Sequence, residues 1–105
     1  MYAYQDLFQR SVRMIGQAAQ DRLQNSHVAV LGLGGVGSHA AEALARAGIG
    51  ELTLVDKDIV DVSNINRQLV ALCSTVGQAK TDVMARRIQD INPHVRIHTY
   101  PMFFL

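Results

Sequence analysis

The chain has 105 residues, 49% of them hydrophobic, and a formal net charge of +1 at pH 7. That length fits one domain, and the small charge, without any run of Lys or Arg, argues against a strongly basic nucleic-acid surface. One cysteine excludes an internal disulfide, and neither a signal segment nor an apolar stretch of about 18 residues is found. We therefore expect a cytoplasmic protein without a membrane segment.

The first 26 residues predict a helical segment. Apolar side chains recur at helical spacing over residues 4–15, and Gly16 follows where this helix can end. A second, shorter helix is expected at about 17–24. The apolar stripe of the first helix comprises Tyr4, Leu7, Phe8, Ser11, Met14 and Ile15.

The next segment carries the most informative pattern of the chain. An apolar strand at 27–31 continues into the motif G-x-G-G-x-G and then into an Ala-rich helix at about 36–47. Glycines at these positions permit a sharp turn, bare backbone N–H groups for a phosphate, and close packing of the helix on the sheet. This order predicts a nucleotide-binding loop. Its glycines are Gly32, Gly34, Gly35 and Gly37.

A second strand at 51–55 ends at Asp56. Its carboxylate is placed to accept hydrogen bonds from ribose hydroxyls, or else it caps a turn. Asp58 either assists a magnesium ion or solvates the turn. Farther on, Ser63 or Asn64 can cap a short helix that carries Arg67.

A longer helix is expected at about 77–91, with an apolar stripe that includes Val76, Val83 and Ile88. Lys80 lies in its first turn, where the helix dipole disfavours a cation unless an anion lies between them. Asn92-Pro93 ends the helix, and a third strand follows at 95–100 before an apolar, exposed end at 101–105. NAD and FAD are the default ligands of the glycine motif, but Lys80 and Arg67 add the positive charge that a triphosphate needs.

Cys73 lies among apolar neighbours without an adjacent His or Lys, so we interpret it as a small buried hydrophobic residue. The histidines show no metal-ligand spacing with Cys73, and we expect no transition metal held by the protein. They are His27, His39, His94 and His98.

These elements predict an α/β fold with a parallel sheet of order 3-2-1, the N-terminal half of a doubly wound, Rossmann-like fold with flanking helices. The other half is missing, so we expect an excised fragment or a truncated gene product. The first strand would then keep a free edge, which predicts a homodimer.

Four motifs in this order resemble the ubiquitin-activating-like superfamily that includes the ThiF, MoeB and HesA adenylating enzymes: G-x-G-G-x-G, D-x-D at 56–58, S-N-x-x-R-Q at 63–68 and V-G-x-x-K at 76–80. The resemblance runs from Arg10 to about Pro93. The form Asn-Ile-Asn-Arg-Gln at 64–68 is most similar to the branch of tRNA threonylcarbamoyladenosine dehydratases.

The resemblance implies that residues 1–105 are the N-terminal part of a domain that binds ATP and Mg²⁺ and adenylates a carboxylate. In this branch the carboxylate is that of threonylcarbamoyladenosine in tRNA, which then cyclises. The implied nucleotide-binding residues are the four glycines with Asp56, Asp58, Ser63, Asn64, Asn66, Arg67, Gln68 and Lys80.

Arg67 and Lys80 are the cations that the resemblance assigns to the phosphates. It also implies that Arg10 or Arg13 enters the nucleotide site of a partner in a dimer, although both could instead be surface charges of the helix. Any catalytic cysteine and a later magnesium-binding aspartate would lie beyond residue 105, so we expect the fragment to be inactive alone.

Other interpretations stay open. Within the superfamily, the chain could adenylate a ubiquitin-like sulfur-carrier protein. From other classes, it could be an NAD-binding dehydrogenase domain or an inactive dimerising fragment.

Overall fold

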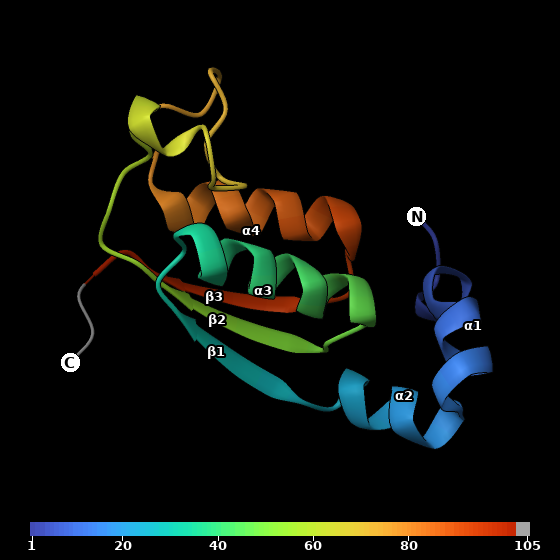
Figure 1. The fold of residues 1–105 in the computed structure, drawn as a ribbon. Coiled ribbons are helices and arrows are strands. Elements are labelled where there is room, and N and C mark those ends of the chain that lie inside the picture. The colour runs from blue at the N-terminus through green and yellow to red at the C-terminus, as the bar shows by residue number, and fades with distance from the viewer. Residues whose placement is uncertain (103–105) are drawn as a thin grey trace.

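The sheet of this chain has two helices on one face and two more beyond the amino ends of its strands (Figure 1). The computed structural model describes residues 1–102. Its elements are α1 (Tyr4–Ile15), α2 (Gln17–Gln24), β1 (His27–Leu31), α3 (Gly35–Ala47), β2 (Glu51–Val55), the 3-10 helix η1 (Val62–Asn64), α4 (Lys80–Ile91) and β3 (Arg96–Tyr100).

The three strands are parallel and ordered β1-β2-β3, which confirms the predicted α/β fold with its 3-2-1 sheet. Their side chains alternate between two faces. One face carries Val30, Leu52 and Leu54, which are buried beneath α3 and α4. The opposite face begins with His27 on β1, paired in register with Glu51 on β2, and it is more exposed.

The two N-terminal helices dock at the amino ends of the strands. Tyr4 Oη donates a hydrogen bond to the Gly48 carbonyl at 2.6 Å, and the buried Gln20 donates through Nε2 to the Ala47 carbonyl at 3.0 Å. A Cβ at Gly50 would come within 1.7 Å of the Gln24 carbonyl oxygen. The end of α2 therefore packs directly on the backbone that leads into β2.

Part of the predicted α1 stripe is wrong. Met14 and Ile15 are 86% and 47% exposed, and Phe8 is the buried residue of this helix. Phe8 has non-helical dihedral angles (φ −117°, ψ 16°) that kink α1. The apolar stripe of the second half therefore does not continue that of the first.

The long helix begins at Lys80 rather than at 77. Gly77 has φ +90°, and Ala79 is extended and forms an antiparallel bridge with Ile59. Residues with these conformations are not helical, so α4 begins only at Lys80. Val76 is exposed and, contrary to the prediction, does not belong to the apolar stripe of this helix. The third strand likewise starts one residue later than predicted, at Arg96.

Two further predictions between β2 and α4 are wrong. The short helix is η1, and its N-cap is Asp61 rather than Ser63 or Asn64: Asp61 accepts a hydrogen bond from the Ser63 N–H at 2.9 Å. Arg67 lies after η1, in a turn. Cys73 is exposed, because it lies in a surface turn rather than in a packed helix or strand.

Among residues 1–102, no helix combines the length and apolar character that crossing a membrane requires. Met102, at the start of the predicted apolar end, is 55% exposed. The rest of that predicted end, 103–105, lies outside the described residues.

Candidate nucleotide-binding site

The loop between β1 and α3 forms the centre of the candidate site. Gly32 turns the chain off the strand with φ +96°, a conformation that other residues rarely adopt, and its N–H donates to the Val55 carbonyl at 2.8 Å. A Cβ at Gly37 would lie 1.8 Å from the Gly32 carbonyl oxygen. Glycine at 37 therefore lets the first turn of α3 pack against the loop, where helix N–H groups without intrahelical partners can meet an anion.

Asp56 connects this loop to the end of β2. The side chain is buried, with 8% exposed, and its two carboxylate oxygens accept from different backbone groups: the Leu33 N–H and the Asp58 N–H, both at 2.7 Å. One carboxylate thus holds the glycine loop and the segment after β2 in fixed relation. It also brings a negative charge to the carboxyl ends of the strands.

Lys80 approaches the same edge of the sheet from α4. Its side chain is 7% exposed, its N–H donates to the Asp58 carbonyl at 3.1 Å, and its Nζ lies 4.0 Å from Asp58 Oδ2. Asp58 also pairs with Lys57 at 3.1 Å. The ammonium of Lys80 is therefore held by a mostly buried stem beside the Asp56–Asp58 turn.

Lys80 also acts electrostatically on Asp61. The Ser63 hydroxyl and backbone N–H hold the pKa of the Asp61 carboxyl below its usual range, and Lys80 lowers it further through space. Asp61 organises this turn, yet it was absent from the predicted site residues. The signal was present in the sequence as Asp-x-x-Asn, since the Asn64 side chain accepts from the Asp61 N–H at 2.9 Å.

Gln68 lies against the glycine loop. Its Nε2 would be 3.8 Å from a Cβ on Gly34, and its Oε1 is buried without a hydrogen-bond partner in the described part of the chain. The Arg67 backbone carbonyl lies close to Gly35, but the Arg67 side chain is exposed. Its Nη1 donates within its own turn, to the Ser63 carbonyl at 3.1 Å and to the Asn66 side chain at 2.9 Å.

Arg10 and Arg13 are exposed on α1, beyond the amino ends of the strands (Figure 1). The glycine loop lies at the opposite, carboxyl ends. Within one chain these two arginines therefore do not join the candidate site.

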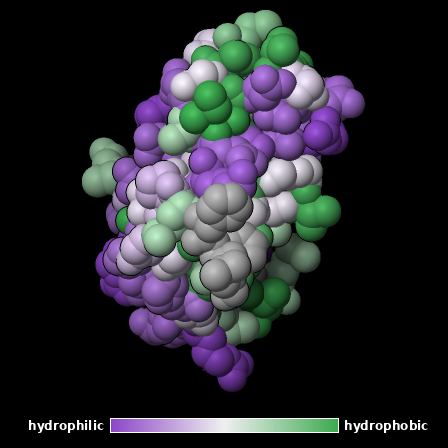
Figure 2. Space-filling view, turned by 90° about the vertical axis from the view of Figure 1, so that its left-hand side faces the viewer, coloured by the Kyte–Doolittle hydropathy of each residue, from purple (hydrophilic) through white to green (hydrophobic). Residues whose placement is uncertain are grey.

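Figure 2 shows the molecule from the side of the carboxyl ends of the strands. The upper part of this view, formed by the segment between β2 and α4, presents apolar patches among polar ones. Exposed apolar side chains of this segment are Ile59, Val62, Ile65, Leu72 and Val76. The candidate site thus lies beside an exposed, partly apolar surface.

The chain has a glycine loop at the carboxyl end of a parallel strand, a buried carboxylate at the end of the next strand and a lysine on α4. These features place it in the Rossmann-like class of folds, whose members bind nucleotides at this edge of the sheet. The family follows from a comparison with known proteins. A model of the ThiF family matches residues 8–104, and the chain belongs to this family.

The chain is similar to two proteins of known name. The chain is 58% identical over 97 residues to the tRNA threonylcarbamoyladenosine dehydratase of Bacillus subtilis. The aligned region covers 92% of the chain and 38% of the relative. It is 45% identical to the adenylyltransferase and sulfurtransferase UBA4 of Lodderomyces elongisporus, over 79% of the chain and 18% of that protein.

Among solved structures, the chain matches the E. coli tRNA N6-threonylcarbamoyladenosine dehydratase TcdA in complex with ATP. The TM-score is 0.95 at 48% identity, over 98% of this chain and 42% of that one. The chain therefore spans well under half the length of the relatives it matches.

Proposed function

We propose that the chain is the nucleotide-binding N-terminal part of an ATP-dependent adenylating enzyme that acts on threonylcarbamoyladenosine in tRNA. The observation that carries this proposal is the glycine loop, which Asp56 fixes through the Leu33 N–H, together with the ammonium of Lys80, which lies 4.0 Å from Asp58 in the turn that follows Asp56. The names of the B. subtilis and E. coli relatives support the substrate, and the E. coli complex supports ATP as the ligand.

The residues present fit a nucleotide. Gly34 and Gly35 leave room for phosphate oxygens next to bare backbone, and the orphaned Oε1 of Gln68 marks a buried polar position beside them. Lys80 would hold phosphate oxygens through its ammonium. Bound ATP supplies the adenylyl group that activates a carboxylate for displacement.

Arg67 would reach the phosphates by leaving the hydrogen bonds within its own turn, and Asp58 offers a carboxylate for Mg²⁺. Ser63, Asn64 and Asn66 build the turn that carries Arg67. Arg67 and Lys80 would stabilise the charge that develops on the phosphates during adenylation.

We also propose a homodimer in which Arg10 or Arg13 enters the partner's site, and a cytoplasmic location alongside the tRNA substrate. A ubiquitin-like sulfur carrier is the alternative substrate, and the 45% identity to an adenylyltransferase and sulfurtransferase favours it as second candidate.

Replacing Lys80 by Met tests the proposal, since Met keeps the buried stem and removes the charge. A hydrogen bond to a charged group contributes about 1.5–3 kcal/mol, so ATP-Mg²⁺ should bind roughly 10- to 150-fold more weakly to Lys80→Met. Isothermal titration measures this. Arg22→Ala, which removes an exposed charge on α2, is the matched control and should leave the affinity unchanged.

NAD serves as the competing ligand in the same titrations. Tighter binding of NAD than of ATP, or equal ATP affinity in the Lys80→Met and unmodified chains, would refute the nucleotide assignment. Release of pyrophosphate by a longer protein that contains this chain, with modified tRNA or with a sulfur carrier, separates the two substrates.

A further inference from the structure

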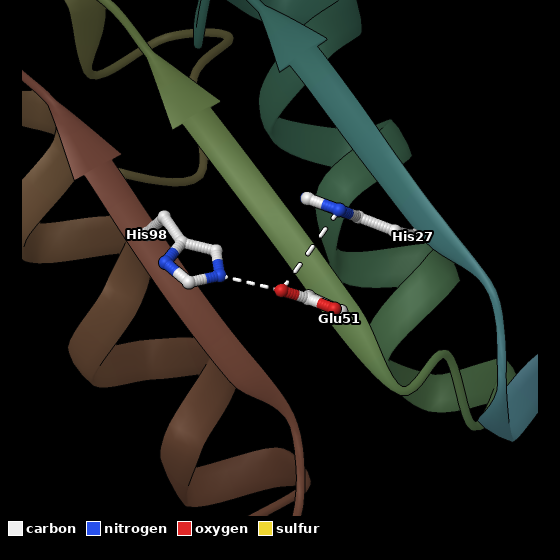
Figure 3. A group of neighbouring side chains, drawn as sticks. All are labelled: His27, Glu51 and His98. Carbon is white, nitrogen blue, oxygen red and sulfur yellow. Dashed lines mark hydrogen bonds and ion pairs between the residues drawn. The ribbon is translucent and has the colours of Figure 1, made fainter.

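Three side chains that no sequence motif connects meet on the face of the sheet opposite α3 and α4 (Figure 3). They come from three strands: His27 from β1, Glu51 from β2 and His98 from β3. The parallel register pairs His27 with Glu51, and it places His98 two residues beyond the β3 partner of Glu51. We propose that His27, Glu51 and His98 form a binding site for a Zn²⁺ ion.

The geometry brings three donor atoms together. His98 Nε2 lies 2.6 Å from Glu51 Oε2, His27 Nδ1 lies 3.9 Å from the same oxygen, and one ligand atom from each residue lies within 4.8 Å of the others. Zinc bonds of about 2.0–2.2 Å require neighbouring donors a little over 3 Å apart. Small side-chain rotations would therefore enclose an ion.

The second nitrogen of His27 has its own partner. Nε2 lies 2.6 Å from the Thr53 hydroxyl, and an N–H at this position donating to Oγ1 leaves Nδ1 with its lone pair toward Glu51. Two acceptors would then face each other across 3.9 Å, an arrangement that a cation between them stabilises. A ring nitrogen oriented by a hydrogen bond at the other nitrogen is typical of metal-bound histidines.

Glu51 is prepared to act as a ligand. Arg96 contacts Oε1 at 3.0 Å and leaves Oε2 directed at the two histidines. Glu51 is 22% exposed and the histidines are about half exposed, so an ion from solvent can reach the site.

The donor set suits a transition metal better than Mg²⁺ or Ca²⁺, which prefer oxygen ligands. Two imidazoles and one carboxylate suit Zn²⁺, which keeps a fourth position for water in such sites. His98 binds an ion through the lone pair of Nε2, and in the neutral imidazole that does so the proton resides on Nδ1. The site lies on the open face of the sheet and not at the glycine loop, so it stands independently of the nucleotide proposal.

Zinc titration of the tag-free 105-residue chain, in competition with a chromophoric chelator, tests the site. We expect one Zn²⁺ per chain and a higher thermal midpoint in its presence. His98→Gln and Glu51→Gln should each weaken binding at least roughly tenfold. His39→Gln removes an exposed histidine on α3, and Cys73→Ser removes the exposed thiol; both should bind like the unmodified chain.

Far-UV circular dichroism verifies that each variant is folded. Absence of stoichiometric binding to the unmodified chain, or equal affinity of folded His98→Gln and His39→Gln, would overturn the proposal. Loss of binding in Cys73→Ser would also overturn it, because the thiol would then be the ligand.

Discussion

Replacing Asp56 by Ala should destabilise the fold strongly. The substitution removes the acceptor of two backbone N–H groups, that of the fully buried Leu33 and that of Asp58, each at 2.7 Å. A hydrogen bond to a charged group contributes about 1.5–3 kcal/mol, so the lower end of the range predicts a loss of about 3 kcal/mol for the pair. For a domain of this size that corresponds to a fall in melting temperature of roughly 12 °C or more.

Thermal unfolding followed by circular dichroism measures the effect. Asp56→Asn keeps one oxygen as an acceptor without the charge, so its melting temperature should lie between those of Asp56→Ala and the unmodified chain. Asp90→Ala, on the exposed side of α4, should keep a free energy of unfolding within about 0.5 kcal/mol of the unmodified chain. If Asp56→Ala melted within about 2 °C of the unmodified chain, the carboxylate would not hold the loop, and our account of the site would be wrong.

Gly37→Ala should lower stability and ATP affinity together, because its Cβ would meet the Gly32 carbonyl oxygen at 1.8 Å; Gly35→Ala, with 3.9 Å to its nearest neighbour, is the control for stability. The hydrogen bond from Arg87 on α4 to Glu42 on α3 is the main cause that lowers the pKa of Glu42 below 4.5. Ionised Glu42 therefore adds stability above about pH 4.5, and this stability is lost as pH falls through its folded pKa. We expect the urea midpoint of Arg87→Gln to depend less on pH, between about pH 6 and pH 3, than that of the unmodified chain; an equal pH dependence in both would contradict this. Light scattering should give twice the mass of one chain, since β1 has no second strand beside it among the described residues and Leu31 on it is 54% exposed; a monomer would refute the homodimer.

The sheet order and the glycine loop were predictable because their signals are local. A β-branched strand, spaced glycines and an Ala-rich helix follow one another directly, and parallel strands joined by helices admit few topologies. The start of α4 was not predictable in this way. Gly77 and Ala79 adopt their conformations because the chain returns to pair with Ile59, a contact that no window of sequence around residue 77 contains.

The same distinction applies to Cys73 and to the histidine cluster. Apolar neighbours suggested a buried thiol, but burial depends on what packs over a turn, and Leu72 beside it is also 51% exposed. Spacing along the chain could not connect His27 with His98, since strand register brings them together. Side chains on different parallel strands can therefore be assigned to one site only when the strand register is known.

The carboxylate of Asp56 caps the turn after β2, and we propose that it accepts from ribose hydroxyls as well. An ionised carboxylate has about four lone-pair sites, and the N–H groups of Leu33 and Asp58 use one on each oxygen. The remaining sites can accept from ribose hydroxyls without releasing the loop. Because the same oxygens would hold the loop and the sugar, ATP would meet a phosphate cradle and a ribose acceptor already fixed relative to each other, and little ordering of this loop would oppose binding.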